Sequence, residues 1–269
     1  MNSSKPNITI PVDLTNPGQF FACCGLLELA DRLWPGAEGW FTDLKFSISS
    51  EDISYDLSAI LNALAVATIE PVDHDDNASA IRLDLGEVSI LLDWWRDEAA
   101  GGQRLKTWAG RQSGPQIFSL MTAKITEAAG AGSGNPLDFS AAVFEIKNGK
   151  TKKKTISPFY FDSRRASTSL DAGFSADEQQ MSVREYPVVE SLAMIGMQRF
   201  RPRADEAIFP RSFLYTAWSD RLPIILAQGV VCGAVTAPSC NTYRFNKPSR
   251  GGEYVSMFTR ATRERSPNV

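Results

Sequence analysis

The sequence has little of the chemistry that metal centres and hydrolytic enzymes use. Its 269 residues include one histidine, His74, and four cysteines, none of which forms a C-x-x-C pair. A structural zinc site needs clustered cysteines or histidines, and a Ser or Cys triad would have to use the single histidine. We therefore predict no metal, no cofactor and no catalytic residue. The cysteines are expected to be free thiols in a reducing cytoplasm.

Long apolar runs are also missing. Residues 1–7 are polar, and no apolar stretch approaches the roughly 18 residues of a membrane-spanning helix. The longest apolar stretch, residues 222–235, is interrupted by Gln228, Gly229 and Gly233 and predicts a buried pair of strands. The sequence thus predicts neither a signal peptide nor a transmembrane helix, and it favours a cytoplasmic protein without a membrane partner.

Motifs of nucleotide binding and metal catalysis are incomplete. Residues 149–151, Gly-Lys-Thr, end like a phosphate-binding loop, but Phe144 stands where that loop needs its first glycine. The segment 73–76, Asp-His-Asp-Asp, offers ligands for a divalent ion. Side chains adjacent in sequence rarely converge on one ion, so we interpret the segment as an exposed acidic loop. A metal-dependent nuclease that uses this segment remains an alternative.

The two parts of the chain differ in the charge they lack: residues 1–100 have few basic residues, and residues 101–269 have fewer acidic than basic residues. The whole sequence carries 28 basic and 31 acidic residues, a net charge of −3. Residues 1–100 contain 5 basic and 17 acidic residues, a net charge of −12, whereas residues 101–269 contain 23 and 14, a net charge of +9. This asymmetry predicts an acidic α+β part, 1–100, and a basic α+β part, 101–269, that faces a polyanion. The two parts could also form one continuous domain.

The hydrophobic periodicity predicts alternating helices and strands. An α+β protein follows, with mixed, mainly antiparallel sheets, packed helices and a ferredoxin-like arrangement as one option in its N-terminal part. The expected helices are residues 19–33, 53–67, 115–128 and 183–200. The expected strands are residues 8–12 and 40–48, the hairpins 80–85/88–94 and 141–147/150–161, and several strands within 208–260.

The second of these hairpins is rich in lysine. Its turn is Asn-Gly, a strong signal for a tight hairpin turn. Five positive charges lie within eight residues without an acid among them: Lys147, Lys150, Lys152, Lys153 and Lys154. Such a cluster either contacts phosphate groups or forms a solvated strand edge that resists aggregation.

The loop 105–115 combines cations, an aromatic ring and glycines. Lys106, Trp108, Arg111 and Gln112 precede an expected helix whose first N–H groups would face an anion. Side chains and backbone could hold a phosphate group there. In the alternative interpretation the loop is capped and Trp108 fills a hole in the core.

Arginines supply two further candidates. Arg164 and Arg165 follow the aromatic run 159–161, and aromatic rings beside arginines can stack on bases and bind phosphates. The same alternation also suits core packing. Arg199, Arg201 and Arg203 alternate at the end of a predicted helix, where cations also stabilise the helix dipole.

Three segments resemble a known family. Residues 10–30, IPVDLTNPGQFFACCGLLELA, together with the loop 106–112 and the stretch 169–175, SLDAGFS, are similar to the third Csb protein of type I-U (I-G) CRISPR–Cas systems. That family is regarded as a reduced Cas-eight-like large subunit of the interference complex. The resemblance offers no catalytic motif to transfer.

The resemblance implies a non-catalytic subunit of a crRNA-guided, Cascade-like DNA surveillance complex in antiviral defence. Its partners would be crRNA, target DNA, the other Csb and Cas subunits and the nuclease-helicase. Its tasks would be PAM reading, R-loop stabilisation and helicase-nuclease recruitment, while guide pairing supplies sequence specificity. The alternative is a protein–protein adaptor whose basic half binds an acidic partner.

Overall fold

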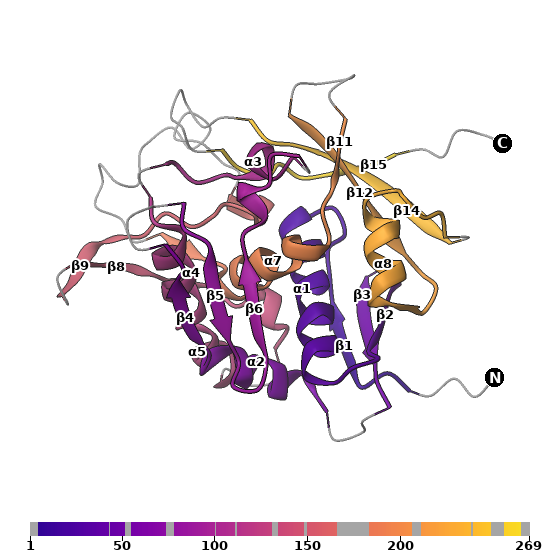
Figure 1. Ribbon diagram of the computed structural model, residues 1–269, viewed down its shortest axis with the longest axis horizontal. Coiled ribbons are helices and arrows are strands. Elements are labelled where there is room, and N and C mark those ends of the chain that lie inside the picture. The colour runs from indigo at the N-terminus through magenta and orange to yellow at the C-terminus, as the bar shows by residue number, and fades with distance from the viewer. Residues whose placement is uncertain are drawn as a thin grey trace.

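The computed structural model describes residues 5–42, 44–51, 55–73, 78–99, 101–110, 112–130, 134–147, 150–165, 183–205, 211–237, 239–248 and 256–264. In these residues, helices are combined with several antiparallel sheets, which confirms the predicted α+β class (Figure 1). The described helices are α1 (Pro17–Leu33), α2 (Leu57–Ala65), α3 (Gly102–Leu105), α4 (Gly114–Thr122), α5 (Ile125–Gly130), α7 (Pro187–Arg199) and α8 (Ile224–Val231), with 3₁₀ turns η1 (Trp94–Arg96), η2 (Pro136–Asp138) and η3 (Ser163–Arg165).

The described strands form small antiparallel sheets, with the orders β1-β3-β2-β13, β4-β5-β6, β11-β12-β14-β15, β10-β7 and β8-β9. Their bounds are β1 (Ile8–Pro11), β2 (Glu38–Thr42), β3 (Lys45–Ser49), β4 (Thr68–Pro71), β5 (Ile81–Asp84), β6 (Ser89–Leu92), β7 (Ala141–Ala142), β8 (Phe144–Lys147), β9 (Lys150–Thr155), β10 (Arg184–Glu185), β11 (Arg203–Ala204), β12 (Ser212–Trp218), β13 (Leu222–Pro223), β14 (Cys240–Asn246) and β15 (Thr262–Arg263).

Two buried helices, α1 and α7, cross at the centre of the molecule. The Asn16 side chain caps α1. A Cβ atom on Gly25 would lie 2.0 Å from the carbonyl oxygen of Leu192, and one on Gly196 would lie 2.1 Å from that of Phe21. Only glycine permits this backbone contact. Figure 1 shows the helix pair between sheet β4-β5-β6 and sheet β1-β3-β2-β13.

The N-terminal sheet is half of a ferredoxin-like arrangement. Both β1 and β2 pair antiparallel with β3, so β1 and β2 run in the same direction and α1 connects them. In a ferredoxin-like fold the strand after the second helix would return to the same sheet. Here that strand, β4, pairs with β5 in a different sheet, and β13 joins beside β2 instead. The ferredoxin-like option therefore holds only for β1–α1–β2–β3.

The acidic and basic parts of the chain share one hydrophobic core. Phe20 on α1 stacks on Tyr215 of β12 with ring centroids 4.3 Å apart. The Tyr215 hydroxyl donates to the carbonyl oxygen of Leu14 at 2.6 Å, and the Trp218 indole N–H donates to that of Gly39 at 2.7 Å. The charge boundary near residue 100 therefore does not separate two cores.

Some predicted elements were wrong in detail. The single strand 40–48 is the hairpin β2–β3, because the chain turns around Leu44. The stretch 222–235 forms mainly helix α8 and not a strand pair. Its glycines did not prevent a helix, because the buried residues Ile224, Ala227, Val230 and Val231 follow helical spacing. The helix 115–128 divides into α4 and α5, and strand β4 was not predicted.

Candidate nucleic-acid interface

The predicted lysine hairpin is present as strands β8 and β9. Lys147 lies opposite Lys150 in the register, and the pairing is irregular between Phe144 and Ile146. In the described part of the chain this hairpin pairs with no other sheet, and Figure 1 shows it projecting from the body of the molecule. All five predicted lysines therefore lie on a protruding hairpin: Lys147, Lys150, Lys152, Lys153 and Lys154.

The aromatic residue of the loop before α4, Trp108, lies in the hydrophobic core. Trp108 is 2% exposed, and its ring contacts Trp94, Trp95 and Phe159, with centroids 5.0 to 5.9 Å away. It has no free face for base stacking, so the core-filling alternative describes its position. Lys106 is half-buried, and its ammonium lies 5.2 Å from the Trp108 ring centroid.

Of the other two predicted residues of this loop, the structure describes Gln112 but not Arg111. The side-chain oxygen of Gln112 accepts a hydrogen bond from the Ala109 backbone N–H at 2.9 Å. Gln112 therefore stabilises the loop itself. Arg111 lies outside the described residues.

The two arginines after the aromatic run are engaged by carboxylates. The Arg164 guanidinium contacts Asp162 at 2.6 Å and Asp138 at 2.8 Å, and it stacks 3.5 Å from the ring centroid of Tyr186. Arg165 pairs with Glu185, whose carboxylate is buried, at 2.8 Å. These ion pairs already hold the guanidinium groups in fixed positions within the fold.

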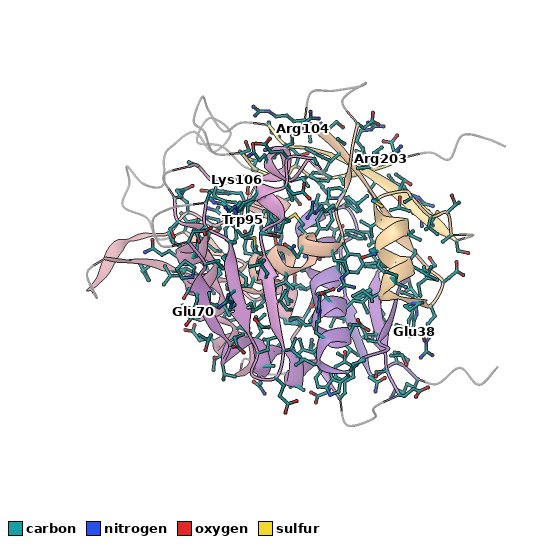
Figure 2. The ribbon with its side chains drawn as sticks, in the orientation of Figure 1. Glu38, Glu70, Trp95, Arg104, Lys106 and Arg203 are labelled. Carbon is teal, nitrogen blue, oxygen red and sulfur yellow. The ribbon has the colours of Figure 1, made fainter. Side chains whose placement is uncertain are left out.

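The arginines at the end of α7 divide into two kinds. Arg199 pairs with Glu28 at 2.7 Å, and Arg201 pairs with Asp97 at 2.6 Å. Arg203, on β11, is exposed. Figure 2 shows Arg203 and Arg104 along the same edge of the molecule, with Lys106 nearby. Of the three predicted arginines here, Arg203 is the one whose position suits contact with an external phosphate.

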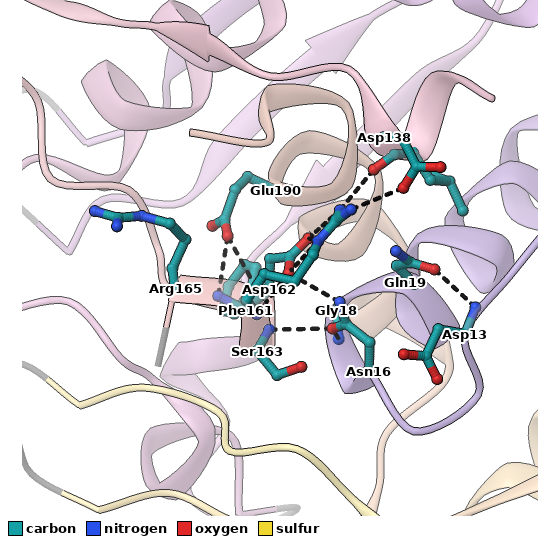
Figure 3. A network of polar contacts seen from close by, with 12 residues as sticks. Asp13, Asn16, Gly18, Gln19, Asp138, Phe161, Asp162, Ser163, Arg165 and Glu190 are labelled. Atoms are coloured by element: carbon teal, nitrogen blue, oxygen red, sulfur yellow. Dashed lines mark hydrogen bonds and ion pairs between the residues drawn. The ribbon is translucent and has the colours of Figure 1, made fainter. Parts of the chain in front are cut away.

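We call one polar cluster the anchor network. It consists of the side chains of Asn16, Asp162, Arg164 and Glu190 (Figure 3). The Asn16 side-chain amide donates to Asp162 at 2.8 Å, and the backbone N–H groups of Phe161 and Asp162 both donate to Glu190 at 3.1 Å. Burial raises the pKa of Glu190 to about 8, and the nearby negative charge of Asp162 adds to this effect. The network fastens the segment before η3 to the starts of α1 and α7.

A second polar cluster lies beside the loop and was not predicted. We call it the lysine site: Lys106, Thr107, Arg211 and Lys247. Lys247 is 5% exposed, and its ammonium donates to the carbonyl oxygen of Lys106 at 2.7 Å. Its backbone N–H donates to the carbonyl oxygen of Arg211 at 3.0 Å. No described carboxylate forms an ion pair with Lys247.

Burial and a neighbouring cation both affect the protonation of Lys247. Burial lowers the pKa of Lys247 from 10.5 to about 8, and the positive charge of Arg211 lowers it further. Among the described residues, the buried side-chain atoms without a hydrogen-bond partner include Thr107 Oγ1, Trp108 Nε1 and Asn246 Oδ1, and also Glu190 Oε2 of the anchor network. Such atoms are rare in folded proteins.

The sequence holds a signal for the burial of Lys247. Tyr243 and Phe245 are buried on one face of β14, and Lys247 follows at the same spacing of two. A period of two predicts that all three side chains point to the same, buried face. A lysine on such a face is unusual enough to mark a candidate site.

Comparison of the chain with family models, with curated proteins and with solved structures finds no match. Within the described ranges no helix has the length and apolarity needed to cross a membrane. Likewise, no described group of three or more His, Cys, Asp or Glu side chains could hold a metal ion. Residues 74–76 of the acidic loop lie outside those ranges, and Asp73 pairs with Arg96.

Proposed function

We propose that the protein is a non-catalytic subunit of a type I, crRNA-guided DNA surveillance complex and that it contacts the nucleic-acid backbone. PAM reading, R-loop stabilisation and recruitment of the helicase-nuclease are the tasks assigned to it in this proposal. The observation that carries it is the β8–β9 hairpin, which bears five lysines and stands apart from the other sheets. The resemblance of residues 10–30 to the third Csb protein family supplies the type of complex.

The burial of the predicted aromatic residues supports contact with the nucleic-acid backbone and not stacking on bases. Aromatic rings that could have stacked on bases, Trp108, Phe159 and Phe161, are at most 2% exposed. Contacts to phosphate groups are independent of sequence, and in a guided complex base pairing supplies the specificity. Exposed cations combined with the burial of these three rings fit this division of labour.

The adaptor alternative differs in the partner of the same basic surface. An acidic protein would need a defined arrangement of carboxylates opposite the hairpin, whereas a nucleic acid offers a regular row of phosphates. Binding to nucleic acid should therefore depend steeply on salt and little on base sequence. This difference can be measured on the assembled complex.

The test replaces Lys152, Lys153 and Lys154 by alanine in the complex assembled with its crRNA. Binding to target duplex is then measured by fluorescence anisotropy over a series of salt concentrations. We expect weaker binding and a log–log salt slope that is smaller by about 0.9 for each lost phosphate contact. Lys5→Ala with Lys45→Ala, two exposed lysines of the acidic part, is the control.

The outcomes separate the two hypotheses. An unchanged salt slope in the triple variant, with the complex intact, would remove the hairpin from the nucleic-acid interface. Loss of a protein subunit from the complex, with target binding by the remainder unchanged, would favour the adaptor.

A further inference from the structure

We propose that a proton on the buried carboxyl of Glu190 holds the base of the lysine hairpin on the body of the molecule, so that loss of the proton and detachment of the base are coupled. We call residues 141–143, which lead into β8, and residues 156–165, which follow β9, the hairpin base. The coupling is a property of the fold, and only its effect on nucleic-acid binding rests on the proposed function.

The C-terminal side of the hairpin base is attached directly to Glu190. One carboxyl oxygen, Oε1, accepts hydrogen bonds from the backbone N–H groups of Phe161 and Asp162, each at 3.1 Å (Figure 3). Glu190 lies in the first turn of α7, one of the two central helices. These two hydrogen bonds therefore connect the chain that follows β9 to the core of the molecule.

The N-terminal side of the base reaches the same part of the fold through β10. Strand β7 pairs antiparallel with β10, and Ala141 lies opposite Glu185. The backbone N–H of Ile156 donates to the carbonyl oxygen of Val143 at 2.7 Å and so joins the two sides of the base. Because β10 directly precedes α7, both sides of the base are attached to residues 184–190.

Glu190 differs from the two other buried carboxyl groups of this region. Asp162 pairs with Arg164 at 2.6 Å, and Glu185 pairs with Arg165 at 2.8 Å. Within the described residues Glu190 forms no ion pair, and its second carboxyl oxygen, Oε2, has no hydrogen-bond partner. Burying a carboxylate without a paired cation is costly, so the attached state favours the protonated carboxyl.

Charged neighbours strengthen this preference. The charged side chains on the adjoining elements are Asp162, Arg164 and Arg165 at η3, Glu185 on β10 and Asp138 on η2. Two tyrosines, Tyr160 and Tyr186, adjoin the two arginines. The negative charges of Asp162 and Glu185 oppose ionisation of Glu190, and Arg165 is the cation that interacts with it. Burial is the largest cause of the raised pKa of about 8, and the two like charges add to it.

The other elements that pack on α7 bring no charge to this end of the helix. Helix α4 and strand β6 contain no charged residue. On α1 the charged residues begin at Glu28, which pairs with Arg199 at the opposite end of α7. On α5, Glu127 is exposed and pairs with Lys124. The protonation of Glu190 is therefore set by its burial and by the groups of the hairpin base and β10.

Detachment of the base exposes Glu190 to water and changes its affinity for the proton. The attached carboxyl keeps its proton up to about pH 8, whereas an exposed one loses it near 4.5. The detached state binds fewer protons between these values, so its population rises with pH, by about tenfold per pH unit in the middle of the window, and levels off above pH 8. The buried rings of Phe159 and Phe161 oppose detachment, so the detached state stays the minor one.

The coupling bears on nucleic-acid binding because the base orients the five lysines of the hairpin. An attached base fixes the direction in which the hairpin projects from the body, and a detached base does not. A nucleic acid that binds the oriented hairpin would shift the equilibrium toward the attached, protonated state. Binding and retention of the proton would then favour one another.

The experiment measures amide hydrogen exchange of the full chain at pH 6, 7, 8 and 9, with each rate divided by the intrinsic rate at that pH. The reporting amides are those of Phe161 and Asp162, and the amides of residues 20–27 in α1 report global unfolding. Glu190→Gln keeps an oxygen for the two N–H donors but cannot ionise. Glu70→Gln, at an exposed position on β4, is the matched control.

We expect the corrected exchange of the two reporting amides in wild type to rise about tenfold from pH 6 to pH 7 and only about twofold from pH 8 to pH 9. Glu190→Gln should remove this rise, and Glu70→Gln should keep it. The reporting amides should also exchange faster than those of α1 at every pH, because detachment is local.

Two results would overturn the inference. Corrected exchange that does not change with pH in wild type would exclude the coupling, and this result needs no variant, so it decides the matter even if Glu190→Gln does not fold. Equal opening free energies for the reporting amides and the α1 amides would show that only global unfolding exposes Glu190.

A second measurement keeps this inference separate from the proposed function. In the complex assembled with its crRNA, target duplex should slow exchange of the hairpin base, because the duplex binds the attached hairpin. If the duplex leaves this exchange unchanged while the pH dependence is present, the coupling stands and the hairpin is not the nucleic-acid contact. If the duplex slows exchange but the pH dependence is absent, the proposed function stands and the role of Glu190 is refuted.

Discussion

The anchor network and the lysine site both bury charge next to aromatic side chains, but they balance it in opposite ways. In the anchor network, Arg164 contacts Asp162 at 2.6 Å and Asn16 donates to the same carboxylate. At the lysine site, Lys247 has a carbonyl oxygen as its described partner and a second cation as its electrostatic neighbour. The cation of the first cluster is paired with carboxylates of the chain. Lys247 is paired with none of the described carboxylates.

This difference shows why residue type alone is a poor guide to a binding site. Arg164, Arg165, Arg199 and Arg201 look like phosphate ligands in the sequence, yet each is held by a carboxylate. A cation that is already paired must break that pair before it can bind a phosphate. Lys247 forms no ion pair with a described carboxylate, so no such pair has to be broken there.

The largest expected effect comes from breaking the anchor network. Asp162→Ala leaves Arg164 and the Asn16 amide without their shared acceptor, and we expect a loss of about 3 kcal/mol in the free energy of unfolding. Denaturant unfolding measures it. Asp138→Ala removes the exposed partner of the same arginine and should cost under about 1 kcal/mol. Equal losses in the two variants would mean that the network does not anchor this segment.

A smaller effect follows from the raised pKa of Glu190. The folded protein holds a proton on this group up to about pH 8, while the unfolded chain loses it near 4.5. Stability therefore falls as pH rises through that window. Glu190→Gln keeps an oxygen for the two backbone N–H donors but cannot ionise. We expect it to be more stable than wild type at pH 8, by about 2 kcal/mol, and to show no advantage at pH 4.5. A constant difference across the window would contradict the assignment.

The smallest expected effect is the pH dependence of stability contributed by Lys247. It has the opposite sign to that contributed by Glu190. Because the pKa of Lys247 is lowered from 10.5 to about 8, the unfolded chain binds more protons between these values. Its contribution to stability therefore rises with pH from about 8 to 10.5. Lys247→Met should lack this rise, which we expect to be about 1 kcal/mol after screening by solvent. Unfolding at both ends of the window, with Lys45→Met as control, measures the difference. Parallel curves for Lys247→Met and wild type would show that Lys247 is not desolvated.

The accuracy of the sequence predictions follows the range of the interactions involved. Helix α1 was found because Asn16, Pro17 and the apolar run after them act locally. The β8–β9 hairpin was found because Asn-Gly is a local turn signal. Strand β4 was missed because its exposed residues give no apolar pattern and its pairing with β5 selects it. A loop before helix α4 was predicted from local residues, but the buried position of Trp108 in it depends on contacts with Trp94, Trp95 and Phe159.

The sequence by itself determined the α+β class, the charge of the two parts of the chain and the lysine-rich hairpin, because composition, periodicity and turn chemistry are local properties. Only the tertiary structure decided which cations are neutralised. Glu28 and Arg199, or Asp97 and Arg201, meet across more than a hundred residues of chain. The same folding placed the Lys247 ammonium against the Lys106 carbonyl oxygen, with no described carboxylate paired to Lys247. Charge balance depends on such long-range contacts, which no local pattern in the sequence specifies.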